Sequence, residues 1–280
     1  MSLIIYDILF AKNPSWWVEN VSEIFNLWLK NILEVSTGLI CISESVANEV
    51  KEWINKNPPK RLALPEVMSF HLGADISSSL PSKGLPISAS HVLELVGSKL
   101  SFLMVGTLEP RKGHMQTLEA FEKLWSEGND IVLVIVGKEG WLVDTLIEKL
   151  KNHPELNKKL FWLAGISDEY LEKIYDASTC LIAASEGEGF GLPLIEAAQK
   201  KLPIIARDIP VFKEVAGKYA YYFSNSKEPY VLAKAIDEWI DLYKSNEYPK
   251  SDNMPWLTWK ESTEQLLNCL QITSNQENNK

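Results

Sequence analysis

Five short, continuous runs of apolar residues constrain the fold more than any other feature of this sequence. Strands that are buried on both faces have such runs, whereas half-exposed strands alternate apolar and polar residues. Strands of this kind belong to parallel sheets that helices cover on both sides. The runs are SFLMVG (101–106), IVLVIVG (131–137), LFWLAG (160–165), TCLIAAS (179–185) and LPIIAR (202–207).

Amphipathic segments separate these runs. Within 115–127, Met115, Leu118 and Phe121 recur at helical spacing and form one apolar stripe. The same spacing recurs in 142–150, 168–177 and 192–201. Strands that alternate with helices in this way predict βαβ units, and therefore an α/β fold with a doubly wound parallel sheet.

The first 76 residues predict a smaller piece of α/β structure. They contain apolar runs typical of buried strands and amphipathic segments typical of helices, and Ser43 is placed to cap a helix that starts at Glu44. Three strands are too few for a stable layered sheet. The expected strands are LIIYDILF (3–10), STGLICIS (36–43) and MSFHLGAD (68–75), and the expected helices are 23–33 and 44–56.

Composition along the chain predicts the domain borders. Residues 77–98 are rich in Ser and Pro, which indicates a linker. We therefore expect an incomplete N-terminal domain over 1–76, a linker over 77–98 and a complete domain over 99–250. A terminal helix over 251–272 and a disordered tail over 273–280 would follow. Because the first residues form a buried strand without a cap, we also expect the chain to start inside a domain.

Charge and cysteine usage exclude several classes of protein. A net charge of -9 argues against a general nucleic-acid binder, which normally presents a basic face. The three cysteines lie far apart and lack CxxC spacing, which argues against a disulfide framework or a zinc site. The sequence contains neither an apolar run of the roughly 18 residues needed to cross a bilayer nor a recognisable signal peptide. We expect a cytoplasmic protein.

Two segments that follow expected strands carry the candidate chemistry. The segment GTLEPRKGH (106–114) places Arg111 and Lys112 side by side after the first run. Ligands of open α/β sheets bind beyond the carboxyl ends of the strands, and adjacent cations suit a diphosphate there. Taken alone, such a pair is typical of a solvated surface.

The second segment, SEGEGFGLPLIE (185–196), enters a helix with Pro193 in its first turn. The amides of Gly189–Leu192 would face an anion at the positive end of the helix dipole. Glu188 and Glu196 flank them, and carboxylates suit sugar hydroxyls better than phosphates. The pattern predicts a nucleotide-sugar site, although either glutamate alone would be typical of an exposed helix.

These segments carry a resemblance to a known family. EGFGLPLIEA, with its E-x7-E spacing, and VGTLEPRKGH are similar to the C-terminal domain of retaining GT-B glycosyltransferases of family four. LAGISDEYLEKIYDAS (163–178), LPIIARDIPVFKEVAG (202–217) and W-x-x-S at Trp259–Ser262 extend the similarity. The form GTLEPRKGH most resembles bacterial mannosyl- and related transferases of surface-polysaccharide assembly. The resemblance implies a GT-B-type Rossmann-like fold and a hexosyltransferase, with mannose as the expected sugar.

The resemblance also implies roles for individual residues. Arg111 and Lys112 would bind the donor diphosphate and stabilise the leaving group, so that neither a metal nor another cofactor is needed. Glu188 would contact the donor sugar and count with these two cations as catalytic, and Glu196 would hold the ribose. Further donor contacts are implied for Gly106 and Thr107 (phosphate end), Gly189, Phe190, Gly191 and Leu192 (sugar and phosphates), and Ile166 and Leu171 (base).

The resemblance breaks down at the N-terminus, where much of the family's N-terminal domain has no counterpart. Relatives often carry His where this chain has Tyr6, so the general base stays open. We expect a donor-binding part of a transferase that uses a polysaccharide or lipid-linked acceptor and needs the missing region for turnover. The alternative is a non-catalytic nucleotide-sugar-binding module or a subunit of a split transferase. A second polypeptide would then supply the missing half, and membrane contact would be peripheral at most, at the inner face.

Overall fold

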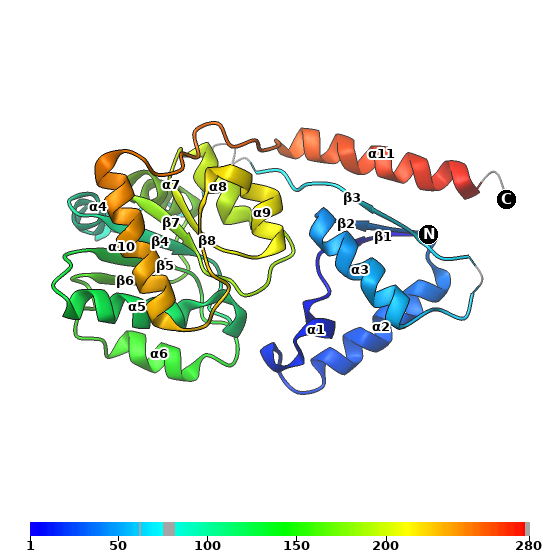
Figure 1. Ribbon diagram of the computed structural model, residues 1–280, viewed down its shortest axis with the longest axis horizontal. Coiled ribbons are helices and arrows are strands. Elements are labelled where there is room, and N and C mark those ends of the chain that lie inside the picture. The colour runs from blue at the N-terminus through cyan, green and yellow to red at the C-terminus, as the bar shows by residue number, and fades with distance from the viewer. Residues whose placement is uncertain (62, 75–81, 278–280) are drawn as a thin grey trace. The chain divides into compact units, whose positions relative to one another are not determined.

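The computed structural model describes residues 1–61, 63–74 and 82–277, which divide into two compact units (Figure 1). The first unit comprises Met1–Ala74, Gly187–Leu192 and Trp256–Lys280. The second comprises Asp75–Glu186 and Pro193–Pro255. The segment 187–192 therefore belongs to the first unit, although the chain enters and leaves it from the second.

The second unit is built on a six-stranded sheet in which every neighbouring pair is parallel. The strand order is β6-β5-β4-β7-β8-β9. This arrangement confirms the predicted α/β fold with a doubly wound sheet. The strands are β4 (Ser101–Val105), β5 (Val132–Val136), β6 (Leu160–Leu163), β7 (Cys180–Ala183), β8 (Ile204–Arg207) and β9 (Tyr221–Phe223).

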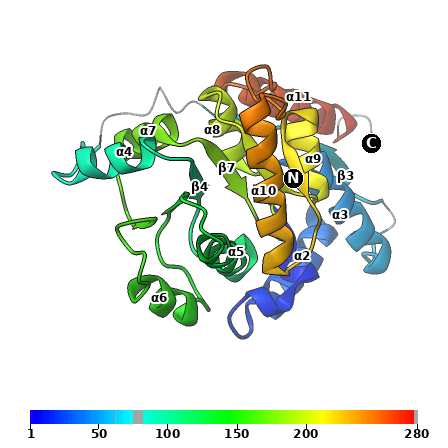
Figure 2. The same cartoon turned by 60° about the vertical axis from the view of Figure 1, so that its left-hand side comes forward.

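Helices cover both faces of this sheet. Helix α5 packs against α10, and α4 packs against α7; Figure 2 shows the two pairs apart from each other. The helices are α4 (Ala89–Gly97), α5 (His114–Ser126), α6 (Asp144–Lys151), α7 (Asp168–Ala177), α8 (Leu192–Gln199), α9 (Pro210–Ala216) and α10 (Pro229–Ser245), with short 3-10 turns η3 (Pro110–Lys112) and η4 (Gly217–Tyr219).

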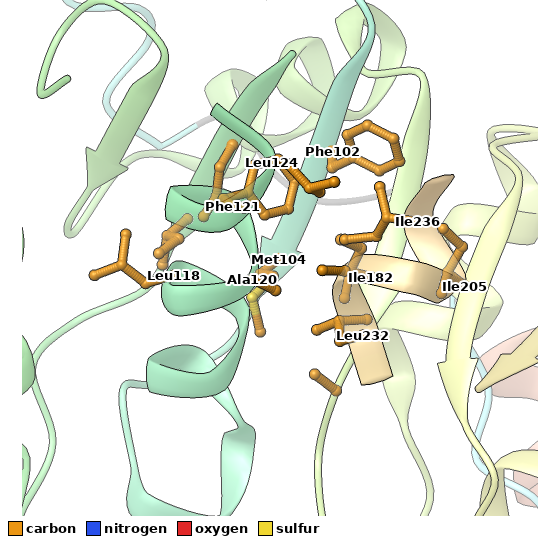
Figure 3. Packing of buried hydrophobic residues seen from close by; sticks show 14 of the residues in the cluster. Phe102, Met104, Leu118, Ala120, Phe121, Leu124, Ile182, Ile205, Leu232 and Ile236 are labelled. Atoms are coloured by element: carbon orange, nitrogen blue, oxygen red, sulfur yellow. The ribbon is translucent and has the colours of Figure 1, made fainter. Parts of the chain in front are cut away.

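An apolar core fills the space between the sheet and helices α5, α6 and α10 (Figure 3). Phe102 and Met104 point into it from alternate positions of β4, and Leu103 between them is equally buried. Burial on both faces explains why the strand sequences are continuously apolar. Trp239 of α10 is fully buried and packs edge-on against Phe102, with 5.6 Å between ring centroids.

The first unit contains a smaller parallel sheet of three described strands in the order β1-β2-β3. Ser43 caps α3 as predicted, because its Oγ accepts a hydrogen bond from the amide of Val46 at 3.1 Å. The elements are β1 (Ser2–Ile5), β2 (Gly38–Cys41), β3 (Glu66–Ser69), α1 (Leu9–Lys12), η1 (Pro14–Trp16), α2 (Val21–Val35), α3 (Glu44–Lys56) and α11 (Trp259–Glu277).

Some elements differ from the expectations. Helix α4 lies inside the predicted linker 77–98, where Val96 gives it a buried apolar contact; residues 75–81 lie outside the described part. Helix α11 continues to Glu277, into the predicted tail 273–280. Strand β3 ends at Ser69, earlier than the predicted strand 68–75. None of the described helices combines the length and apolar character needed to cross a membrane.

Two glycines meet where β4 and β5 end. A Cβ at Gly137 would lie 1.9 Å from the carbonyl oxygen of Gly106, so only glycine fits there. The amide of Gly106 donates to the carbonyl of Val136 at 2.9 Å, and this extends the pairing of the two strands. The close approach therefore fixes the backbone at Gly106, directly after β4.

We expect Gly137→Ala to lower the free energy of unfolding by about 1–3 kcal/mol, the usual cost of overpacking. The clash involves backbone on both sides, so no side-chain rotation relieves it. Gly97→Ala is the control, because no atom lies within 4 Å of its new Cβ and it ends helix α4. That change should be neutral or stabilise by up to about 1 kcal/mol. Urea unfolding measures both, and equal stabilities for the two variants would contradict the expectation.

Candidate functional site

The strand order of the second unit reverses between β4 and β7. Strands β5 and β6 extend the sheet on one side of β4, whereas β7, β8 and β9 extend it on the other. Loops that leave the two strands at such a reversal run to opposite faces and open a crevice in which ligands bind. β4 and β7 pair directly, at Phe102 with Cys180 and at Leu103 with Leu181. Both segments singled out in the sequence leave this point of the sheet.

Lys112 lies over the backbone that follows β4. A Cβ at Gly106 would come within 3.7 Å of both Cε and Nζ of Lys112. Gly106 has a φ of 144°. Thr107, the next residue, is exposed. The structure thus brings Lys112 to Gly106, and phosphate contacts were predicted for both of them and for Thr107.

Arg111 has a neighbour that the sequence prediction missed. Its Nε lies 2.9 Å from Oε2 of Glu109, and the two side chains are only 13% and 9% exposed. The guanidinium of Arg111 is therefore partly neutralised by an adjacent acid, whereas the sequence prediction treated it as a simple phosphate ligand. The spacing E-P-R placed the two charges two residues apart, but the conformation of η3 decides that they meet.

The two loops contact each other within the second unit. The amide of Glu186 donates to the carbonyl of Arg111 at 2.8 Å. Gly113, at a φ of 74°, lies so close to the end of β7 that a Cβ would be 2.4 Å from the carbonyl oxygen of Ala184. The carboxylate of Glu186 also pairs with Lys227, at 2.6 Å. Arg111 and Lys112 are therefore held beside the start of the second loop.

Glu196, one turn into α8, has a buried hydrogen-bond donor. The hydroxyl of Tyr175 on α7 donates to Oε2 of Glu196 at 2.7 Å. Tyr175 is 1% exposed, so its hydroxyl has little access to water. The tyrosine fixes one oxygen of the carboxylate and thereby orients the other. The sequence prediction included Glu196 but not Tyr175, because nothing in the chain links residues 21 positions apart.

The environment of this pair changes the acidity of both groups. Burial raises the pKa of Glu196 above its ordinary value of 4.5; the hydrogen bond from Tyr175 lowers it, and the charge of Asp168 adds to the rise. Burial, together with the charge of Glu196 and the hydrogen bond to it, raises the pKa of Tyr175 well above 10.0. Tyr175 therefore stays protonated and remains a donor at neutral pH.

The two residues predicted to contact a base lie at the start of α7. Ile166 precedes the N-cap Ser167, whose Oγ accepts from the amide of Tyr170 at 3.1 Å. Ile166 and Leu171 are both half-buried. Leu171 is four residues before Tyr175 and so shares its helix face. Helix α7 thus carries a predicted base contact and the donor to Glu196 on one stripe.

Gly189 and Phe190, in the segment Gly187–Leu192, contact residues of the first unit. A Cβ at Gly189 would lie 2.1 Å from the carbonyl oxygen of Tyr6, and the carbonyl of Gly189 accepts from Ser43 Oγ at 2.7 Å. Phe190 is 4% exposed and packs edge-on against His71, with 5.3 Å between ring centroids. The approach of the Tyr6 backbone already requires glycine at position 189, and the predicted contact of these glycines with a donor stays a prediction.

The predicted site residues therefore divide between the two units. Gly106, Thr107, Arg111, Lys112, Ile166, Leu171 and Glu196 belong to the second, and Glu188, Gly189, Phe190, Gly191 and Leu192 to the first. Glu188 is half-buried, and Gly191 has a φ of 101°. Within the described part of the chain, no group of three or more His, Cys, Asp or Glu side chains is placed to hold a metal ion.

We expect Glu196→Gln to stabilise the fold more at about pH 7 than at about pH 4.5. The folded-state pKa of Glu196 exceeds its unfolded value, so the ionised carboxylate destabilises the fold progressively as pH rises through 4.5. Glutamine removes this penalty. Tyr175→Phe removes the hydrogen bond that lowers the pKa of Glu196, so the loss of stability should continue to higher pH. In a Glu196→Gln background, Tyr175→Phe should not have this effect on the pH dependence. Thermal unfolding of the four proteins measures this, and a gain from Glu196→Gln that is equal at both pH values would contradict it.

Several known proteins are similar to this chain. The model of the family "Glycosyl transferases group 1" matches residues 90–253. The Escherichia coli serotype-specific mannosyltransferase WbdA is 55% identical over 271 residues, which are 96% of this chain but 33% of that protein. The Escherichia coli O-antigen chain mannosyltransferase B is 24% identical over 273 residues, 95% of this chain and 69% of that one. The chain spans about a third of the length of WbdA.

Solved structures share the fold. The sucrose-phosphate synthase of Thermosynechococcus elongatus has a TM-score of 0.72 at 19% identity, covering 96% of this chain and 67% of that one. Anabaena Alr3699/HepE, solved in complex with UDP and glucose, has a TM-score of 0.72 at 16% identity, with 96% and 71% coverage. These likenesses support a GT-B-type fold. The match over residues 90–253 shows that the chain belongs to the group 1 glycosyltransferase family.

Proposed function

We propose that this chain is the donor-binding part of a retaining hexosyltransferase that takes mannose from a nucleoside-diphosphate sugar. The acceptor would be a polysaccharide or a lipid-linked glycan. The observation that carries the proposal is the position of Lys112, whose ammonium group lies over Gly106 at the reversal of the sheet. The WbdA relatives, named as mannosyltransferases, support the choice of sugar.

In the proposed reaction, the bond between the anomeric carbon and the diphosphate oxygen breaks, and the electron pair leaves with the nucleoside diphosphate. The hydroxyl oxygen of the acceptor bonds to the same face of that carbon and releases its proton. The charge that develops on this oxygen needs cations that are already in place. Lys112 and Arg111 would supply them, so we propose a metal-independent enzyme without a cofactor. Glu109 reduces the net charge at Arg111, and Lys112 would therefore carry the larger part of the stabilisation.

Hydroxyl recognition would fall to the two glutamates. Glu196, held at one oxygen by Tyr175, would accept hydrogen bonds from the ribose with the other. Ile166 and Leu171, on the helix that carries Tyr175, would contact the base. Glu188 would contact the donor sugar, together with the amides of Gly189–Leu192. Gly106 and Thr107 would line the phosphate end.

Lys112→Ala should weaken the binding of GDP and UDP by about tenfold or more, since a charged hydrogen bond contributes about 1.5–3 kcal/mol. Glu196→Ala should also weaken binding. Lys123→Ala is the matched control, because it removes the same charge from the opposite end of α5, where Lys123 pairs with Glu127. Isothermal titration calorimetry on the four proteins measures the affinities. Wild-type affinity in the Lys112 and Glu196 variants would refute the assigned site.

A second candidate function is that of a binding module or of one subunit in a split transferase. The first unit favours it, because its described sheet has three strands, fewer than the roughly four to six that are commonest. In addition, α2 exposes large apolar side chains: Ile24 is 63% and Leu27 is 61% exposed. A polypeptide outside these 280 residues would cover this stripe and extend the sheet at β1. Turnover would then need that polypeptide. The proposed location is cytoplasmic, and contact with the membrane would be peripheral at most, at its inner face.

An uncovered apolar stripe should cause self-association when the chain is purified alone. We expect a mass above 31.7 kDa in light scattering, and Leu27→Lys should shift it toward the monomer. Tyr230→Lys on α10 is the control, because Tyr230 is 59% exposed and lies in the second unit. A wild-type chain that stays monomeric at high concentration would argue against a missing partner at α2.

A further inference from the structure

Arg207, at the carboxyl end of β8, is a fully buried cation that the proposed chemistry does not use. Its guanidinium donates hydrogen bonds to three uncharged acceptors. Nε donates to the carbonyl of Ala184 at 2.9 Å, and the two terminal nitrogens donate to the carbonyl of Ser226 and to Oε1 of Gln116. The guanidinium carbon also lies 5.0 Å from the ring centroid of Phe223.

A cation in this position is costly for the fold. Burial lowers the pKa of Arg207, and the charge of Glu186 opposes that change. An apolar side chain of similar volume would avoid the desolvation of a charge. What an apolar side chain would lose is a link between elements that are far apart in the sequence, since the three acceptors lie on three different parts of the chain.

The acceptors lie on both sides of the contact that holds the two loops together. Ala184 is the residue whose carbonyl oxygen meets Gly113, and Gln116 lies three residues after Gly113 in α5. Arg207 therefore donates hydrogen bonds on both sides of the contact between Gly113 and Ala184. Lys112 directly precedes Gly113, so any movement there reaches its ammonium group.

The loop between β9 and α10 is bound into the same cluster. Nε2 of Gln116 donates to the carbonyls of Ser226 and Glu228, at 2.8 and 3.1 Å. Between these two residues, Lys227 pairs with Glu186 of the second loop. Glu186 in turn donates its amide to the carbonyl of Arg111. One guanidinium thus fixes the mutual positions of three loops at this edge of the sheet.

We propose that Arg207 is a positioning residue of the nucleotide-sugar site, which holds the η3 cations in register with the loop that follows β7. It would not touch the donor. It would act through Ala184 and Gln116 on Arg111 and Lys112. The inference rests on the proposed function, since it concerns the geometry in which those two cations meet a diphosphate.

The test separates positioning from general stability. Arg207→Lys keeps the charge, but a single ammonium group does not span all three acceptors; Gln116→Leu removes one arm from the other side. Leu124→Ala is the control, because Leu124 is fully buried near the opposite end of α5 and packs in the core of Figure 3. Affinities for GDP and UDP are measured by calorimetry at a temperature at which circular dichroism shows every variant folded.

We expect Arg207→Lys and Gln116→Leu to bind the nucleotides about tenfold more weakly, because small displacements of binding groups weaken binding. Leu124→Ala should bind the nucleotides with wild-type affinity, even where it lowers the melting temperature as much as the other two variants do. Wild-type affinity in Arg207→Lys and Gln116→Leu, or an equal loss of affinity in Leu124→Ala, would overturn the inference and leave the proposed function intact. A wild-type chain that binds neither nucleotide would overturn both. If Arg207→Lys does not fold, Gln116→Leu decides alone.

Discussion

The pairing of β4 with β7 is the constraint on which the rest of the second unit depends. It places the first strand of the unit at the centre of the sheet, so the chain must add strands on both sides of it. The loops after these two strands then leave from adjacent points. Gly113 can rest on Ala184, and Glu186 can bond to Arg111, only because the strands are neighbours. The positions of the η3 cations therefore follow from sheet topology before any ligand is considered.

Local pattern predicted most of the second unit, because burial on both faces gives a strand a continuous apolar run. Strand β9 was missed because it has three residues, of which Tyr221 and Tyr222 are only half-buried. Helix α10 was also missed, although Leu232, Ile236 and Trp239 recur at helical spacing. The sequence also predicted that Lys112 lies in the loop after the first strand of this unit. Partnerships such as Tyr175 with Glu196 were not predictable, because they arise from tertiary packing.

The glycines show how one residue type has different physical causes. The sequence pattern around Gly189 and Gly191 is typical of a loop that a ligand approaches. In the structure, the missing side chain of Gly189 admits the backbone of Tyr6, and that of Gly137 admits Gly106. Gly113 needs both a left-handed conformation and room for Ala184. A glycine-rich segment therefore identifies a close approach without identifying what approaches, and a fold contact is as good a reason as a phosphate.

The reach of Arg207 has a consequence for how the molecule forms. Its hydrogen bond to Gln116 joins residues that are 91 positions apart, and the one to Ala184 joins residues 23 apart. Contacts between distant segments must offset a loop-closure cost, and chains rich in such contacts fold more slowly. Both β8 and α5 must dock before the guanidinium finds its acceptors. The hydrogen bonds of Arg207 at this edge of the sheet therefore form no earlier than the packing of β8 and α5 against the rest of the unit.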